Sequence, residues 1–153
     1  MCLLGRISKV EGQEHVAYKT LFKQQDGTYN SLFGMLNGYT ENFEVGIVYP
    51  ANGEKWLHDT FTPVNLKNKY DASFHFHRAC NTKGKAELFY NNNFKFLYKT
   101  RQDIIKQMRE NGKQVDYDIT GCPVIVKCRF FGTTYHDPFG ASSSSHFSII
   151  GEE

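Results

Sequence analysis

The stretch CPVIVKCRFF, residues 122–131, is the most hydrophobic strand candidate in the chain. β-Branched and aromatic side chains dominate it, which is typical of a β-strand. A strand this apolar is expected in the centre of a sheet, where its neighbours cover it. Pro123 stands near its beginning, where a strand tolerates a proline. We therefore predict a central strand over 122–131 and expect the rest of the sheet to assemble around it.

Shorter strand candidates lie on both sides of this segment, separated by turn signals. EGQE, residues 11–14, stands between two of them and predicts a hairpin. The Asp26-Gly27 pair predicts a second tight turn. NNN, residues 91–93, predicts a third, because asparagine tolerates positive φ. The expected strands cover residues 2–10, 15–23, 29–36, 42–50, 70–77, 86–90, 94–99 and 146–150.

One main helix is predicted, over about residues 101–111. Thr100 and Asp103 have the spacing of a capping box. Apolar side chains then recur at helical spacing, and Gly112 supplies a stop signal. Together with the strands, this helix predicts a β-rich α+β fold: a mostly antiparallel sheet or open barrel with a helix across one face or end.

Length and composition fit a single domain covering residues 1–153. The hydrophobic content of 40% and the charged content of 22% exclude both a disordered chain and a membrane-embedded one. No apolar run reaches the roughly 18 residues that span a bilayer. The first residues also lack the apolar core of a signal peptide, so we expect a cytoplasmic protein without membrane contact. Within the domain, residues 142–145, SSSS, predict a flexible exposed loop.

Charge is distributed unevenly along the chain. Residues 67–113 hold eleven Lys or Arg and four Asp or Glu, a net charge of +7, whereas residues 1–66 and 114–153 carry −2 and −3. Aromatic side chains are interleaved with the basic ones, and rings stack on bases while positive charge attracts phosphates. This segment therefore predicts an anionic partner, either nucleic acid, a nucleotide or an acidic protein surface, although a β-meander with a basic outer face has the same composition. The residues expected to bind are Arg78, Lys95, Lys99, Arg101, Tyr98 and, in a long loop, Trp56.

Residues 73–80, SFHFHRAC, contain a candidate metal site. On a strand, His75 and His77 share one face and two phenylalanines occupy the other. Two imidazoles so placed can ligate a zinc, iron or copper ion if a third ligand comes from elsewhere. A half-exposed strand that carries two histidines explains the same pattern without a metal. The candidates for the third ligand are His58, Cys80, Cys128 and His136.

The cysteines and histidines also permit a nucleophilic site. Cys80 or Cys128 could pair with His136, which would generate the thiolate, while Asp137 orients the imidazole. Cys2 would carry both an amine and a thiol if the initiator methionine were removed. No sequence typical of a cysteine enzyme surrounds these residues, and burial of each thiol as a small apolar group explains them as well.

No motif for nucleotide binding, metalloprotease or serine-hydrolase chemistry, or calcium binding is present in the sequence. We therefore predict a small non-enzymatic binding domain, without a resident cofactor, whose anionic partner meets residues 67–113. Two alternatives stay open. One is an enzyme with the His75/His77 metal centre or the Cys–His pair, and the other is a protein–protein module or homo-oligomer paired through sheet edges. Abundant Asn, Lys, Tyr and Phe indicate an A/T-rich genome, as in a phage, virus or bacterial symbiont.

Overall fold

The computed structural model describes residues 3, 5–37, 40–50, 77–116 and 118–153. The described chain is rich in strands, with a mostly antiparallel sheet and two long helices, so the expected β-rich α+β class is confirmed. No helix among these residues is long and apolar enough to cross a membrane.

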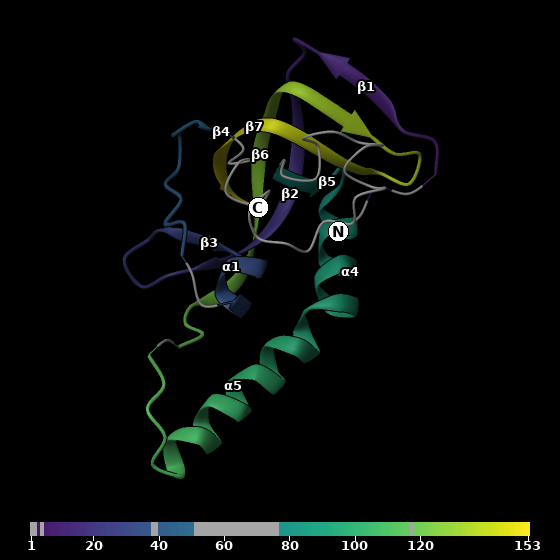
Figure 1. Ribbon diagram of the computed structural model, residues 1–153. Coiled ribbons are helices and arrows are strands. Elements are labelled where there is room, and N and C mark those ends of the chain that lie inside the picture. The colour runs from purple at the N-terminus through teal and green to yellow at the C-terminus, as the bar shows by residue number, and fades with distance from the viewer. Residues whose placement is uncertain (1–2, 4, 38–39, 51–76, 117) are drawn as a thin grey trace, which may run out of the picture.

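A seven-stranded sheet forms the body of the molecule (Figure 1). Its order is β1-β6-β2-β5-β7-β4, β3 pairs with β2, and an additional β6–β7 pairing closes the sheet on itself. We call this closed sheet the barrel. Its strands are β1 Ser8–Glu11, β2 His15–Lys23, β3 Tyr29–Ser31, β4 Tyr49–Pro50, β5 His77–Cys80, β6 Cys122–His136 and β7 Ala141–Glu152.

The predicted central strand is confirmed as β6, which is longer than expected at 15 residues. Its first part, Cys122–Phe130, pairs with β2, and its last four residues pair with β1. Its other edge pairs with β7. Every branch of the sheet that carries a candidate functional residue is therefore positioned by β6 directly or through one neighbour.

The expected hairpin between the first two strands does not form. β1 and β2 both pair antiparallel with β6, one after the other along the same edge. In the link between them, the Gly12 amide donates to the Gly132 carbonyl at 3.1 Å. A strand as long as β6 offers enough edge for both segments, so the chain continues in the same direction instead of turning back.

The Asp26-Gly27 turn is confirmed. The Asp26 carboxylate accepts hydrogen bonds from the Thr28 amide at 2.9 Å and the Thr28 hydroxyl at 2.7 Å, and Gly27 has a φ of 86°. The strand after it is shorter than expected, because the six-residue helix α1, Leu32–Asn37, begins directly after Ser31. The candidate strand over 42–50 is also reduced, to β4 and isolated bridges at Phe43 and Val45. Of the candidate over 70–77, only His77 lies within the described residues.

The two strands expected over 86–90 and 94–99 are wrong, because both segments are helical. Helix α4 covers Lys83–Asn93 and α5 covers Lys95–Glu110. Thr82 caps α4, since its hydroxyl accepts from the Lys85 amide at 3.2 Å. The predicted helix over about 101–111 is thus present but begins six residues earlier, so Thr100 lies inside it rather than at its cap. Gly112 ends it as expected, with a φ of 76°.

The expected flexible loop over residues 142–145 is also wrong, because these serines belong to β7. Residues 141–144 pair with β5 along one edge and, from Ser142 onward, with β6 along the other. Ser142, Ser143 and Ser144 are buried. Serine is small enough to fit where strands crowd together, and pairing on both edges fixes the backbone without help from apolar side chains. Only residues 137–140 form a turn, where the Asp137 carboxylate accepts from the amides of Phe139 and Ala141.

Two separate apolar clusters hold the molecule together. The barrel core fills the interior of the sheet and contains Ala17, Leu21, Tyr29, Phe43, Ala79, Val126, Cys128, Phe130, Phe147 and Ile149. The second cluster joins α4 and α5, which together we call the arm, to the outside of the sheet. This arm core contains Phe22, Leu32, Met35, Tyr90, Phe94, Ile105 and Ile119. Figure 1 shows α5 extending away from the sheet, so the arm is held mainly at its base.

Candidate functional site

The arm carries much of the basic segment. Residues 83–110 contain seven Lys or Arg and three Asp or Glu, a net charge of +4. Lys95, Lys99 and Lys106 are exposed. Because they are four and seven residues apart on α5, their side chains share one face of the helix. At 1.5 Å per residue, this face extends over about 16 Å.

An exposed aromatic ring adjoins these lysines. Phe96 is 77% exposed, the highest value among the large apolar side chains that the structure describes. It directly follows Lys95 and precedes Lys99 by three residues, so the ring and the two ammonium groups lie on adjoining parts of the helix surface. Burial of Phe96 would be favourable, and its exposure therefore marks this part of α5 as a candidate contact surface.

A neighbouring side of α5 packs against the rest of the protein. Tyr98 packs against Phe22, with 4.8 Å between the ring centroids. The Tyr98 hydroxyl donates to the Gly121 carbonyl at 3.3 Å and accepts from the Gln102 amide group at 2.9 Å. Burial raises the pKa of Tyr98. Tyr98 was predicted to bind the ligand, but the structure uses its ring to hold the helix against the sheet.

The other predicted binding residues are not gathered at one place. Arg101 follows Lys99 by two residues, which turns it to a different side of the helix, and it is partly buried. Arg78 belongs to β5 and pairs with Ser143 of β7. Trp56 lies outside the described residues. Of the predicted set, the structure thus brings together only Lys95 and Lys99 on an exposed surface.

The histidine pair predicted to hold a metal is represented by His77 alone, because His75 lies outside the described residues. The Nε2 atom of His77 is 3.0 Å from the Tyr49 carbonyl oxygen, and its ring centroid is 4.3 Å from that of Phe147. Burial, together with nearby Lys19, lowers the pKa of His77 to about 3. Within the described parts of the chain, no three His, Cys, Asp or Glu side chains gather in a way that could hold a metal. His77 is therefore a neutral core histidine with a backbone partner.

Lys19, which no sequence motif singled out, is a half-buried lysine with its ammonium group against the core. The Nζ atom of Lys19 donates to the Arg78 carbonyl at 2.8 Å and lies 5.8 Å from the centre of the Phe147 ring. Burial lowers the pKa of Lys19. The signal was present, because Lys19 stands between Ala17 and Leu21 at a spacing of two and so shares their apolar face of β2.

The residues of the candidate Cys–His site fall in two places. Cys80 lies near Asp137, because it pairs with Ala141, whose amide donates to the Asp137 carboxylate. Cys128 belongs to the barrel core, where burial raises its pKa to about 12, so it is a neutral thiol. Burial also raises the pKa of Cys80. The ring of His136 lies 4.7 Å from that of His15, and Asp137 fixes the turn between β6 and β7. Two further candidates, Cys2 and His58, lie outside the described residues. The geometry thus gives His136 a histidine neighbour and leaves Cys128 inert.

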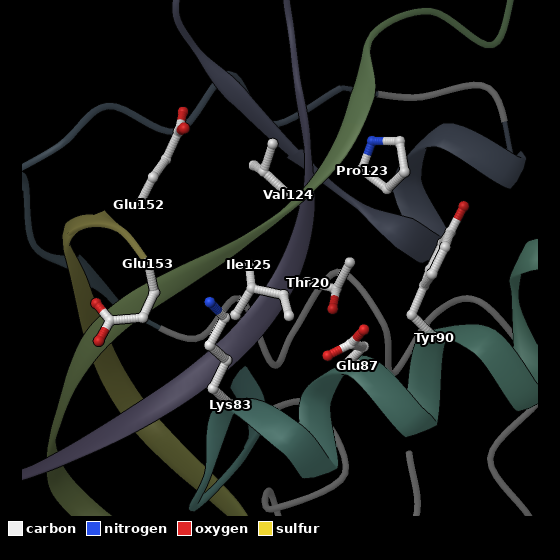
Figure 2. A pocket seen from close by; sticks show the side chains of 9 residues that line it. All are labelled: Thr20, Lys83, Glu87, Tyr90, Pro123, Val124, Ile125, Glu152 and Glu153. Carbon is white, nitrogen blue, oxygen red and sulfur yellow. The ribbon is translucent and has the colours of Figure 1, made fainter.

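One pocket of about 400 Å³ lies between α4 and the adjacent ends of β2, β6 and β7 (Figure 2). Lys83, Glu87 and Tyr90 line it from α4, opposite Glu152 and Glu153. Glu152 already accepts hydrogen bonds from Lys23 at 2.7 Å and from the Tyr29 hydroxyl at 2.8 Å. With three carboxylates and one ammonium group, the pocket is unsuited to an anion. The exposed face of α5 is therefore the better candidate for an anionic partner.

Comparison with known proteins adds no further evidence: no family model, no curated protein and no solved structure matches this chain.

Proposed function

We propose that this protein is a binding domain that contacts single-stranded nucleic acid through the exposed face of α5. The observation that carries the proposal is Phe96, an exposed ring beside Lys95 and Lys99. Lysines alone suit any polyanion, but an exposed ring adds a surface on which a base can stack. This combination favours nucleic acid over an acidic protein surface.

The expected strength of the contact follows from the same residues. Neutralising three phosphates with Lys95, Lys99 and Lys106 predicts that the logarithm of the affinity falls with the logarithm of salt at a slope of about −2. One stacked base contributes about 1–3 kcal/mol. Such a contact is weak and strongly dependent on salt. A cytoplasmic setting fits it, since Cys80, Cys122 and Cys128 are free thiols.

Fluorescence anisotropy with labelled single-stranded RNA and DNA oligonucleotides, titrated from low to moderate salt, tests the proposal. We expect binding to both at low salt with the slope given above. The double variant Lys95→Gln/Lys99→Gln should weaken binding strongly and flatten the slope. Its matched control is Lys9→Gln/Lys127→Gln, which removes the same charge from β1 and β6 and should bind like the wild type.

Phe96→Ala separates stacking from charge. It should weaken binding about fivefold or more, whereas Phe139→Ala, which removes another exposed ring from the β6–β7 turn, should have no effect. Absence of binding to every single strand at low salt overturns the proposal. Equal affinity for polyglutamate, unaffected by Phe96→Ala, would also overturn it and point to an acidic protein surface instead.

A further inference from the structure

The interior of the barrel changes character along its length. Val126, Cys128 and Phe130 of β6 face Phe147 and Ile149 of β7 within the apolar core. Beyond the bulge at Gly132, the inward positions become polar. The Thr134 hydroxyl donates to the Ser144 hydroxyl at 3.1 Å, and His136 pairs with Ser142.

His15 also lies at this polar end. It pairs with Phe130 across the β2–β6 ladder, so its side chain shares the inward face, and its ring contacts the Phe130 ring edge-on at 5.6 Å. The same imidazole ring lies 4.7 Å from that of His136. Residues 121 positions apart in the sequence thus place two imidazoles side by side.

Two buried polar atoms here have no hydrogen-bond partner in the part of the chain that the structure describes. They are the Nε2 atom of His15 and the hydroxyl of Ser142. Both adjoin His136, the first through the ring contact and the second through strand pairing. Burying a polar group without a hydrogen bond lowers the stability of the fold by about 1–3 kcal/mol. Because two such atoms occur at one place, we looked for a ligand that would bond to both.

We propose that His15 and His136 bind a transition-metal ion of the Zn²⁺ type at the polar end of the barrel. With metal–nitrogen bonds of about 2.0–2.1 Å, each ring centroid stands about 3.2 Å from the ion, and a tetrahedral angle separates two such centroids by about 5 Å. The observed separation of 4.7 Å therefore matches two imidazoles that share one ion. In the tautomer protonated at Nδ1, the unpaired Nε2 atom of His15 offers the lone pair that such an ion requires.

The electrostatic state of the two rings suits a metal. A metal binds the neutral form of imidazole, and burial, which lowers the pKa of both His15 and His136, favours that form. His77 provides the contrast, because its Nε2 atom is engaged with the Tyr49 carbonyl. Among the described residues no third His, Cys, Asp or Glu joins the pair, so water would have to fill the remaining coordination positions and the ion would be held less tightly than by three protein ligands. The Ser142 hydroxyl, on the residue paired with His136 across the strands, is a candidate to bond such a water. The inference does not depend on nucleic-acid binding by α5.

Nuclear magnetic resonance of the histidine ring nitrogens, during titration of the full chain with Zn²⁺, tests the site directly. We expect the ring signals of His15 and His136 to shift together and to saturate at one equivalent. The signals of His77 and His146 should stay unchanged. This measurement uses the wild-type protein and does not depend on whether a variant folds. No shift of the His15 and His136 signals at a tenfold excess of Zn²⁺ overturns the proposal.

Calorimetric titration of variants adds the second test. His15→Gln and His136→Gln should each weaken Zn²⁺ binding about tenfold or more. His77→Gln and the double variant His58→Gln/His75→Gln should leave it unchanged. Circular dichroism of each variant without metal verifies that it is folded. If the double variant loses Zn²⁺ binding while His15→Gln retains it, the metal is held by His58 or His75 and the proposal is wrong.

Discussion

The barrel and the arm differ in how much of each is buried. Phe130, Phe147 and Val126 are fully enclosed by strands on all sides of the barrel core. In the arm, Ile105 is 4% exposed within the arm core, whereas Phe96 of the same helix is 77% exposed. These core side chains of the barrel are therefore closed to a partner. The arm has one stabilising side and one free side, which carries the charge.

The largest expected effect is the loss of a ring from the barrel core. Phe147 contacts the rings of Phe43, Tyr49, His77 and Phe130. Phe147→Ala should lower the free energy of unfolding by about 3–5 kcal/mol, measured by urea unfolding. Phe139→Ala removes the same atoms from a side chain that is 64% exposed. This variant should change the free energy of unfolding by less than about 0.5 kcal/mol. Equal effects of the two variants would contradict the enclosed core.

A smaller and more local effect is expected in the arm core. Ile105→Ala should lower the free energy of unfolding by about 2–4 kcal/mol, mostly by loosening α5 from the rest of the arm core. Amide hydrogen exchange should therefore accelerate in α5 well before it does in β6. Ile104→Ala is the matched control, since this neighbouring side chain is 46% exposed and its loss should leave exchange nearly unchanged. Uniform acceleration over both regions would mean that barrel and arm unfold as one unit.

The contrast between barrel and arm also explains which elements could be predicted from the sequence. The central strand was foreseen because an apolar run of this length has few other places in a domain. The arm was wrongly predicted as two strands, because Phe94 and Tyr98 fit two periodic patterns at once. With Phe96 they suggest a strand of period two, and with Ala86 and Tyr90 they form a helical series of period four. Phe96 is exposed, so the helical period is the one that the fold uses. This exposure depends on tertiary contacts, which the sequence pattern does not contain.

The candidate sites depended even more on tertiary contacts. His77 was singled out because its neighbours in sequence formed a motif, yet its ring nitrogen is used by the Tyr49 carbonyl. His15 and His136 carry no motif, and only the pairing of β2 with β6 brings them together. The prediction of a loop at the β7 serines was wrong for the same reason, because strand pairing on both edges overrides their loop-like composition. Lys19 alone left a readable signal in its spacing from Ala17 and Leu21.

A more gradual effect is expected from pH, and it should be confined to the barrel. The pKa of His77 falls from 6.5 to about 3 on folding, mainly through burial, so the unfolded chain binds this proton more readily. The contribution of His77 to stability is therefore complete above pH 6.5. It decreases by at most about 1.4 kcal/mol per pH unit as the pH falls toward 3.

His77→Gln isolates this contribution, because glutamine offers a donor to the Tyr49 carbonyl but does not titrate. In urea unfolding between pH 7.5 and 4, the variant should show a shallower loss of stability than the wild type. Hydrogen exchange in α5 should show no corresponding difference, since His77 contacts the barrel core alone. Identical slopes for the two proteins would contradict the assignment of His77 as a neutral, buried base.

The smallest expected effect on stability comes from the ring that matters most for the proposed function. Phe96→Ala removes a side chain that solvent already surrounds, so urea unfolding should change by less than about 0.5 kcal/mol. Tyr98→Ala, two residues away on the same helix, removes the contact with Phe22 and the hydrogen bond to the Gly121 carbonyl. Tyr98→Ala should therefore lower the free energy of unfolding by about 3 kcal/mol. A large loss of stability in Phe96→Ala would mean that this ring packs against the protein, and α5 would then have no free aromatic surface to offer a base.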